Sequence, residues 1–448
     1  MTRPRARKAI YKMGEKKVRI VFCSLFQDAG EATRALELAR GLRRQCPPGL
    51  SPEIIFLSHG GRFDEAFAEA GFSVTPAKPA LPGVGFRQDL KTSALEFVGD
   101  AGLAAELLRG EYEAMLEIRP DFVIHGFWPV AGMAAKLTGT PEICYLPVPF
   151  EPKAFSTWLL QDLPDFVGPL TLLPKTVRMK IMAAIPKSLK LKIPLLRQKN
   201  LIRAFELAGG KENRPENLFD MLKSDFTIIN DFSVFYEGKP LPENFAVTGP
   251  LYPKGTRDAE IDPEIQRRLK PDSGKLKIFC TLGSSGGKDF LLEAIRALKR
   301  MENCTSVVLC PPSVCPFQEA KNVAGGSPDL YLTDAFVPAL KVNKMADVVL
   351  SHGGQGTLQT AVASGTPVVG FAVQPEQQIN LEHIVSFGAA VRLPSRRWKA
   401  DAICGALKTV GTDPHYRSKM QILQKLLTEI DGETEAAKAI WNFCSSQR

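Results

Sequence analysis

The sequence lacks the features that would place the chain across a membrane or outside the cell. No apolar run approaches the roughly 18 residues that a transmembrane helix needs. The basic N-terminus has no apolar core and no cleavage site of a signal peptide. The nine cysteines are odd in number and scattered, and Cys310 with Cys315 fits no zinc-binding spacing. We therefore expect reduced thiols in a cytoplasmic protein, with a peripheral position on the inner membrane face as the alternative.

A basic face that covers a whole domain is also missing. The chain carries a net charge of +9, but residues 1–19 account for +7 and residues 166–205, which contain no acid, for +9, so the remainder carries −7. A nucleic-acid-binding domain would spread its positive charge over one broad face, and we expect no such partner. In residues 166–205, Lys and Arg alternate with Leu, Ile and Met. This pattern fits either a solvated basic helix pair lining a cleft or contact with an anionic membrane.

What the sequence does have is length and a regular alternation of patterns. Its 448 residues, 44% of them apolar and 23% charged, are enough for two hydrophobic cores. Short apolar runs alternate with helical patterns in both halves, which predicts two α/β domains with doubly wound parallel sheets, facing each other across a cleft. The predicted divisions are an N-terminal domain over 1–247 with a basic insertion at about 151–224, a linker over 248–274, a second domain over 275–415 and C-terminal helices over 416–448.

A glycine-rich stretch after an apolar strand is the most informative motif. Residues 348–350 read Val-Val-Leu and run into Ser-His-Gly-Gly-Gln-Gly-Thr at 351–357, followed by a helix. The glycines allow a ligand to approach the backbone, and the helix N-terminus offers unpaired N–H groups and a positive dipole end. This predicts a cradle for a diphosphate, whereas the loop alone would also suit a tight strand-to-helix turn. The candidate ligands in this cradle are His352, Gly353, Gly354, Gly356 and Thr357.

The segments that follow this motif resemble a known signature. After the HGGxGT loop come Gly365-Thr366-Pro367, then Glu376-Gln377 with Asn380, then the turn at 387–389. This order resembles the nucleotide-sugar signature of family 1 glycosyltransferases (UDP-glycosyltransferase-like), and of the related lipid-intermediate N-acetylglucosaminyltransferases. In addition, Gly283-Ser284 resembles the family's turn near the diphosphate, and the segment around Val337 resembles the one that faces the nucleotide base. The resemblance implies the two-Rossmann-domain GT-B fold.

The resemblance also implies an activity. It implies inverting, metal-independent transfer of a sugar from a nucleoside-diphosphate sugar, which we expect to be a UDP-sugar, to an acceptor hydroxyl. The donor, held through its sugar by Glu376 and Gln377, is then a co-substrate, and no cofactor is expected. We expect a small apolar acceptor or a lipid, because aromatic residues lie in loops predicted to face the cleft, although domain-interface packing would also explain them. These residues are Phe26, Phe127, Trp128 and Phe150.

Three alternatives remain open. Thr360 stands where this family often has a glutamate for the ribose, so thymidine remains an alternative to uridine. A lipid glycosyltransferase at the membrane surface is a second enzyme hypothesis. A non-catalytic binding protein that kept only the donor site is a hypothesis of a different class.

The catalytic base is expected in the loop between the first strand and the first helix. The family commonly has a histidine there, but the matching position of this chain holds Glu31, and His125 follows a later strand where an orienting acid is common. We predict that Glu31 and His125 face each other and that either acts as the base, with Asp28 as a third candidate. The alternative is that Glu31 is a solvated residue favoured by the helix dipole and His125 a hydrogen-bonded strand-end residue.

Overall fold

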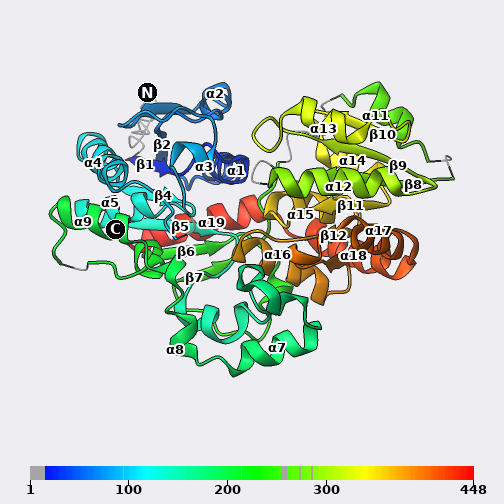
Figure 1. The fold of residues 1–448 in the computed structure, drawn as a ribbon. Coiled ribbons are helices and arrows are strands. Elements are labelled where there is room, and N and C mark those ends of the chain that lie inside the picture. The colour runs from blue at the N-terminus through cyan, green and yellow to red at the C-terminus, as the bar shows by residue number, and fades with distance from the viewer. Residues whose placement is uncertain are drawn as a thin grey trace, which may run out of the picture.

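The computed structural model contains two parallel β-sheets, each covered by helices (Figure 1). It describes residues 16–93, 95–212, 214–253, 260–271, 274–283 and 286–447. The basic residues 1–15 and the predicted diphosphate ligand Ser284 lie outside the described residues.

The N-terminal sheet has seven strands, in the order β3-β2-β1-β4-β5-β6-β7. Its central strands contain runs of buried apolar residues, such as residues 20–23 of β1, because helices cover both faces of a parallel sheet. The strands are β1 (Lys16–Cys23), β2 (Leu50–Ser58), β3 (Ser73–Pro76), β4 (Phe122–His125), β5 (Glu142–Leu146), β6 (Phe226–Ile229) and β7 (Phe245–Val247). The helices between β1 and β5 are α1 (Ala29–Arg44), α2 (Asp64–Glu69), α3 (Phe86–Asp89), α4 (Ala101–Ile118) and α5 (Pro129–Thr138).

The C-terminal sheet has six strands, in the order β10-β9-β8-β11-β12-β13. Its strands are β8 (Leu276–Thr281), β9 (Cys304–Leu309), β10 (Leu330–Thr333), β11 (Val348–Ser351), β12 (Val368–Gly370) and β13 (Ala390–Arg392). Its helices are α11 (Pro263–Arg268), α12 (Lys288–Arg300), α13 (Phe317–Ala324), α14 (Ala339–Met345), α15 (Gln355–Ala363), α16 (Pro375–Ser386) and α17 (Ala400–Thr412). Helix α11 lies within the predicted linker, but its Ile265 is buried beside Phe279 of β8, so it packs as part of this domain.

Both sheets reverse their strand order near the middle. In the N-terminal sheet the reversal lies between β1 and β4, and in the C-terminal sheet between β8 and β11. At such a point the loops that leave neighbouring strands diverge, which opens a crevice at the carboxyl ends of the strands. The loops after β1 and β4, and those after β8 and β11, are therefore where ligands are expected.

The insertion after β5 docks on the C-terminal domain. It contains α6 (Pro152–Ala154), α7 (Lys175–Ala184), α8 (Lys187–Lys190), α9 (Lys199–Leu207) and α10 (Leu218–Leu222). The Arg392 guanidinium of β13 pairs with Asp162 and Asp165 of the insertion, and Arg178 of α7 donates to the same Asp162 at 2.6 Å. These buried pairs fasten the insertion to the opposite domain.

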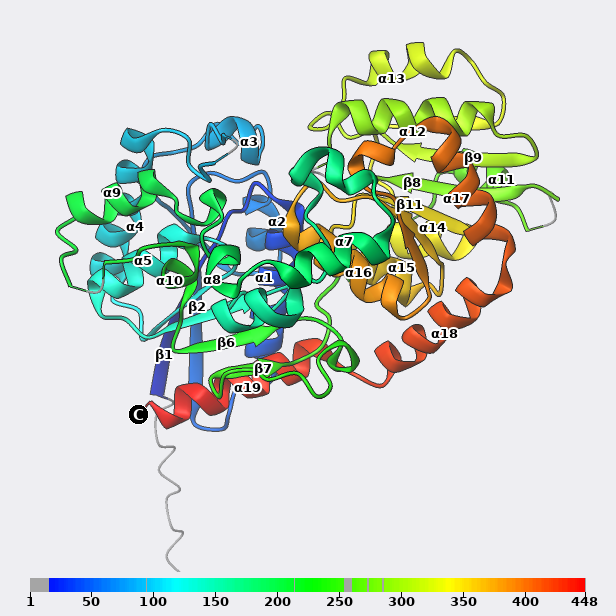
Figure 2. The ribbon, with the colours of Figure 1, turned by 60° about the horizontal axis from the view of Figure 1, so that its bottom comes forward.

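The C-terminal tail forms two helices. Helix α18 (Pro414–Thr428) packs on α15 of the C-terminal domain, and α19 (Gly432–Ser446) packs on α1 of the N-terminal domain. Figure 2 shows the two helices in succession along the bottom of both domains. Among the helices that the structure describes, none combines the length and apolar character needed to cross a membrane.

Candidate functional site

Glu31 lies in the first turn of α1, over the loop that follows β4. Its side chain is only 6% exposed, and its Oε2 accepts a hydrogen bond of 2.9 Å from the Ser24 hydroxyl. A Cβ on Gly126 would lie 1.8 Å from the same oxygen, so a side chain at this position would displace the carboxylate. The loops after β1 and β4 therefore meet around Glu31 at the switch point of the sheet, and Glu31 is not a solvated residue.

Asp28 and His125, the other two candidate bases, have surroundings that differ from those of Glu31. Asp28 caps α1 and accepts a 3.0 Å hydrogen bond from the Gly30 backbone N–H. The imidazole of His125 is fully buried, with Nδ1 2.9 Å from the Gly126 carbonyl and Nε2 3.4 Å from a Glu142 carboxylate oxygen. Burial alone would lower the pKa of His125, but Cys144 and Glu142 raise it to about 10.

The structure does not bring His125 and Glu31 together. Ile124 packs in the core under α1, whereas Val123 packs in the core of the opposite face. Because side chains alternate along a strand, His125 shares the face of Val123 and points away from α1. The expected pairing of the two side chains fails for this reason, and Glu31 and Asp28 are the predicted bases that stay at the switch point.

The glycine-rich loop occupies the switch point of the C-terminal sheet. His352 is 3% exposed, and its ring lies between Gly283 and Gly354, since a Cβ on either glycine would come within 2.6 Å of it. Burial lowers the pKa of His352 to about 4, so the ring is neutral near pH 7. Gly353 has a φ of +80°, and a Cβ there would lie 2.7 Å from the Gln377 carbonyl. These three glycines are therefore required by the packing of the loop itself.

Gly356 and Thr357 differ from the other loop residues. Both lie in the first turn of α15 and are partly exposed, and a Cβ on Gly356 would meet open space. Val337 is 7% exposed and packs in the core with Phe279, so its backbone is what remains for a ligand. The Thr360 hydroxyl donates to the Thr357 carbonyl at 2.9 Å and is occupied within the helix.

Glu376 and Gln377, at the start of α16, make different hydrogen bonds. The Gln377 side-chain oxygen accepts hydrogen bonds from the backbone N–H groups of Val373 at 2.9 Å and Gln374 at 3.2 Å, which completes the cap of the helix. Glu376 accepts a hydrogen bond from Asn380. Burial raises the pKa of Glu376 to about 7, with Asp28 and Glu31 adding to the rise and Arg34 opposing it. Glu376 is therefore close enough to the N-terminal site to feel its charges.

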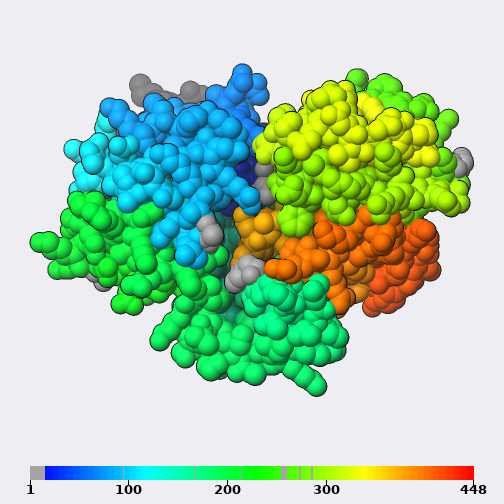
Figure 3. Space-filling view, in the orientation of Figure 1, coloured from blue at the N-terminus to red at the C-terminus, as the bar shows by residue number. Residues whose placement is uncertain are grey.

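A hydrogen-bonded contact joins the two switch points. Arg34 of α1 pairs with Glu31 and donates to the Gln355 side-chain oxygen at 3.3 Å. Gln355 in turn donates to the carbonyl of Pro147 at 3.1 Å and accepts from the Asn230 amide at 2.7 Å. Figure 3 shows the two lobes meeting along a groove. The predicted base and the glycine-rich loop therefore face each other across the domain boundary.

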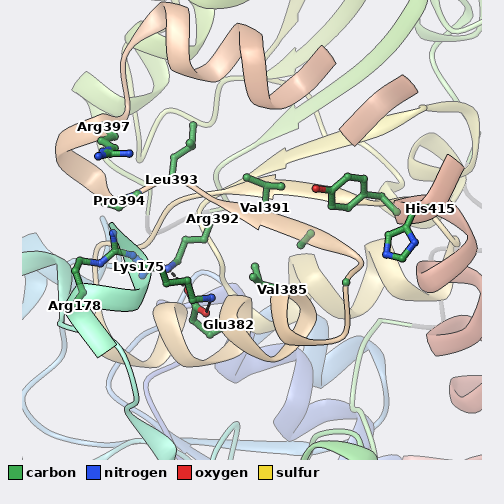
Figure 4. Close-up of a pocket in the computed structure, with 13 residues that line it drawn as sticks. Lys175, Arg178, Glu382, Val385, Val391, Arg392, Leu393, Pro394, Arg397 and His415 are labelled. Atoms are coloured by element: carbon green, nitrogen blue, oxygen red, sulfur yellow. Dashed lines mark hydrogen bonds and ion pairs between the residues drawn. The ribbon is translucent and has the colours of Figure 1, made fainter. Parts of the chain in front are cut away.

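A pocket of about 430 Å³ lies apart from these residues, between α7 and β13. Figure 4 shows Lys175 and Arg178 of α7 approaching Arg392 and Glu382 within it. Arg178 and Arg392 are paired with Asp162, and Lys175 with Glu382 at 2.5 Å. The pocket contains none of the predicted site residues, and its cations are largely neutralised.

The four aromatic residues predicted to face the cleft differ in how deeply they are buried. Phe26 and Trp128 are 1% and 0% exposed and belong to the core of the N-terminal domain, with the Trp128 indole donating to Glu111 at 2.5 Å. Phe127 and Phe150 are partly buried, with ring centroids 5.4 Å apart. The expectation that all four face the cleft is wrong for Phe26 and Trp128, because both rings fill space between helices and the sheet.

Four residues of the site were not singled out in the sequence. They are Ser24, Arg34, Gly126 and Gln355. Gly126 carried a usable signal, because it follows a predicted strand directly. The contact between Arg34 and Gln355 spans 321 positions and has no local signal.

Parts of the chain are similar in sequence to a protein family and to known proteins. Residues 317–439 match the family model described as erythromycin biosynthesis protein CIII-like, C-terminal domain. A PGL/p-HBAD biosynthesis glycosyltransferase of Mycobacterium tuberculosis is 26% identical over 306 residues, which cover 67% of this chain. The match spans 65% of that relative, just under two thirds of its length.

Solved structures match over nearly the whole chain. The glycotransferase of kitacinnamycin has a TM-score of 0.68 at 20% identity, covering 95% of this chain and 99% of the other. The glycosyltransferase VinC, in complex with dTDP, has a TM-score of 0.59 at 14% identity, covering 95% and 100%. The chain therefore has the two-domain GT-B fold of these glycosyltransferases, and the relatives that it resembles in sequence are themselves named glycosyltransferases.

Proposed function

We propose that the protein is an inverting glycosyltransferase that moves a sugar from a nucleoside-diphosphate sugar to a hydroxyl of a small apolar acceptor. The observation that carries the proposal is the contact between the two switch points, where the loop of His352 faces Glu31 through Arg34 and Gln355. A uridine or thymidine diphosphate would bind at the N-terminus of α15, whose N–H groups and dipole favour an anion. The dTDP complex of VinC supports testing thymidine beside uridine.

The chemistry requires one base and a place for the leaving group. The acceptor oxygen attacks the anomeric carbon and forms the new glycosidic bond as its proton passes to Glu31. The bond from the anomeric carbon to the phosphate oxygen breaks, and its electron pair leaves on the diphosphate. Glu31 is suited to this role because Ser24 and Gly126 fix its carboxylate at the carboxyl ends of β1 and β4.

Binding and transfer are tested separately. Calorimetric titration with UDP, dTDP and GDP should reveal selective binding of UDP or dTDP, and the corresponding sugars should give glycosylated products, detected by mass spectrometry, with a panel of apolar alcohols and phenols. Glu31→Gln should abolish transfer and keep nucleotide binding, whereas Glu37→Gln, on the same helix, should keep both. Binding without transfer to any acceptor would favour the non-catalytic alternative, and no binding would refute the proposal.

We also propose that the basic insertion contacts an anionic membrane surface, where an apolar acceptor would partition. Large apolar side chains on and near α7 and α8 are exposed among lysines, and such a grouping of exposed apolar residues is typical of an interaction surface. They are Leu170, Leu172, Val177 and Leu189, with exposures of 44%, 46%, 39% and 58%. Both helices lie at the outer edge of the molecule in Figure 1. Each exposed lysine near an anionic surface adds about 1 kcal/mol.

Vesicle flotation tests this contact. The protein should float with vesicles containing phosphatidylserine and much less with pure phosphatidylcholine. The double variant Val177→Ser and Leu189→Ser should reduce flotation, whereas Leu207→Ser, which changes another exposed leucine at the end of α9, should not. Equal flotation of all three proteins would contradict the proposed surface.

A further inference from the structure

Arg34 is a buried cation at the boundary between the domains. It is 7% exposed, and its guanidinium reaches the Glu31 carboxylate on one side and the Gln355 side-chain oxygen, at 3.3 Å, on the other. A buried guanidinium normally has all its N–H groups hydrogen-bonded. The Nε of Arg34 is buried and has no hydrogen-bond partner among the described residues. The guanidinium therefore has an N–H that no partner uses in the free protein and that can donate to a further anionic oxygen.

The position of Arg34 points to the nature of that oxygen. Gln355 is the first residue of α15, whose nine residues follow Gly354 of the glycine-rich loop. The guanidinium thus lies at the helix N-terminus where the diphosphate of the donor is proposed to bind. Arginine suits this task because its planar fork matches phosphate oxygens.

The charges around Arg34 make it the balancing cation of the site. Burial lowers the pKa of Arg34, but Glu31, Tyr145, Glu376 and Asp28 together raise it above its ordinary value. A diphosphate that enters beside three carboxylates meets like charge, which costs affinity unless a cation is available. In the described part of this cluster, Arg34 supplies that positive charge.

We propose that Arg34 pairs with Glu31 in the free protein and moves onto the diphosphate when the donor binds, which frees Glu31 to act as the base. The inference rests on the proposed function and adds an order to it, with the donor bound before the acceptor is deprotonated. As the sugar passes to the acceptor, the guanidinium balances the negative charge that develops on the diphosphate. Arg34 then belongs to the N-terminal domain but serves the donor held by the C-terminal domain.

The test compares nucleoside diphosphates with their nucleosides. Arg34→Gln should weaken UDP or dTDP binding about 10- to 100-fold, the range for losing a charged hydrogen-bond partner, and leave uridine or thymidine binding unchanged. Arg34→Lys should recover part of the diphosphate affinity. Arg40→Gln is the matched control, because Arg40 lies on the same helix and pairs with Glu37.

The pH profile provides a second readout. Glu31 in Arg34→Gln keeps Ser24, Tyr145, Asp28 and Glu376 as neighbours but loses its cation, so the acid limb of kcat/KM should move to higher pH. Unchanged diphosphate affinity in Arg34→Gln would overturn the inference. A loss of nucleoside affinity as large as the loss of diphosphate affinity would also overturn it, because it would indicate a structural role. If wild type binds neither UDP nor dTDP, the proposed function itself fails.

Discussion

At the scale of single residues, the site is defined by carboxylates that burial and mutual proximity set apart from ordinary surface acids. Glu31 is held by Ser24 beside Gly126. Glu376 lies in the opposite domain, and burial raises its pKa to about 7, with Asp28 and Glu31 adding to the rise and Arg34 and Asn380 opposing it. Glu376 therefore changes its charge near neutrality, and the site is expected to respond to pH in that range.

Glu376 should make stability depend on pH. Its folded pKa of about 7 lies above its ordinary value of 4.5. The folded state therefore holds a proton that the unfolded chain loses, and this contribution to stability is complete below about pH 4.5 and disappears as the pH rises through about 7. The unfolding free energy of wild type relative to Glu376→Gln should fall as the pH rises from about 5 to about 8.

Denaturant unfolding of both proteins across this range measures the effect. Glu429→Gln, which changes an exposed carboxylate at the end of α18, should leave the profile unchanged. A difference between wild type and Glu376→Gln that is independent of pH would contradict the raised pKa.

At the scale of elements, α15 is a helix with a conflict between stability and binding. It carries a glycine in its first turn, where an added Cβ would meet open space within the protein. Packing does not require this glycine, unlike those at 353 and 354. The open space is instead where the proposed diphosphate would approach the backbone. Glycine at this position therefore favours binding of the ligand, although it destabilises the helix.

Gly356→Ala should therefore stabilise the protein and weaken its nucleotide binding. Glycine costs roughly 0.5–1 kcal/mol relative to alanine in a helix, so the unfolding free energy should rise by about that amount. UDP or dTDP affinity should fall by about tenfold or more, because the new methyl group holds the diphosphate away from the N–H groups. Calorimetric titration and denaturant unfolding measure the two effects.

Gly405→Ala is the matched control for this substitution. Gly405 lies inside α17 and also has open space at its Cβ position. The substitution should stabilise the protein to a similar extent and leave nucleotide binding unchanged. Unaltered binding in Gly356→Ala would place the diphosphate elsewhere.

At the scale of the whole molecule, the C-terminal helices tie the two domains together. Helix α19 is the last element of the chain but completes the core of the first domain, where the Trp441 indole donates to the Leu42 carbonyl of α1 at 3.0 Å. Trp398 lies between β13 and α17 in the core of the second domain and donates to the Phe290 carbonyl at 3.0 Å. Both rings are 2% exposed.

The two tryptophans should stabilise different domains. Trp441→Ala should cost about 3–5 kcal/mol, the usual range for removing a buried aromatic side chain, and speed hydrogen exchange in α1 and β1. Trp398→Ala should cost a similar amount and speed exchange in α12 and α17 instead. Faster exchange in the C-terminal domain of Trp441→Ala would show that α19 does not belong to the N-terminal core.

The sequence by itself determined the class of fold, because continuous apolar runs mark central strands of parallel sheets wherever they occur. The four strands at the sheet edges, β3, β7, β10 and β13, carry no such run. These strands are only three or four residues long. Their outer edges lack a neighbouring strand, so they need no long apolar run.

The glycine-rich loop could also be predicted from the sequence, because one continuous segment supplies its strand, turn and helix. Only the tertiary structure decided which side chains share the site. Strand alternation turned His125 away from Glu31, and the cap of α16 took up the Gln377 oxygen. The meeting of Arg34 with Gln355 depends on how two domains dock, and contacts between residues so distant in the chain leave no local pattern in a sequence.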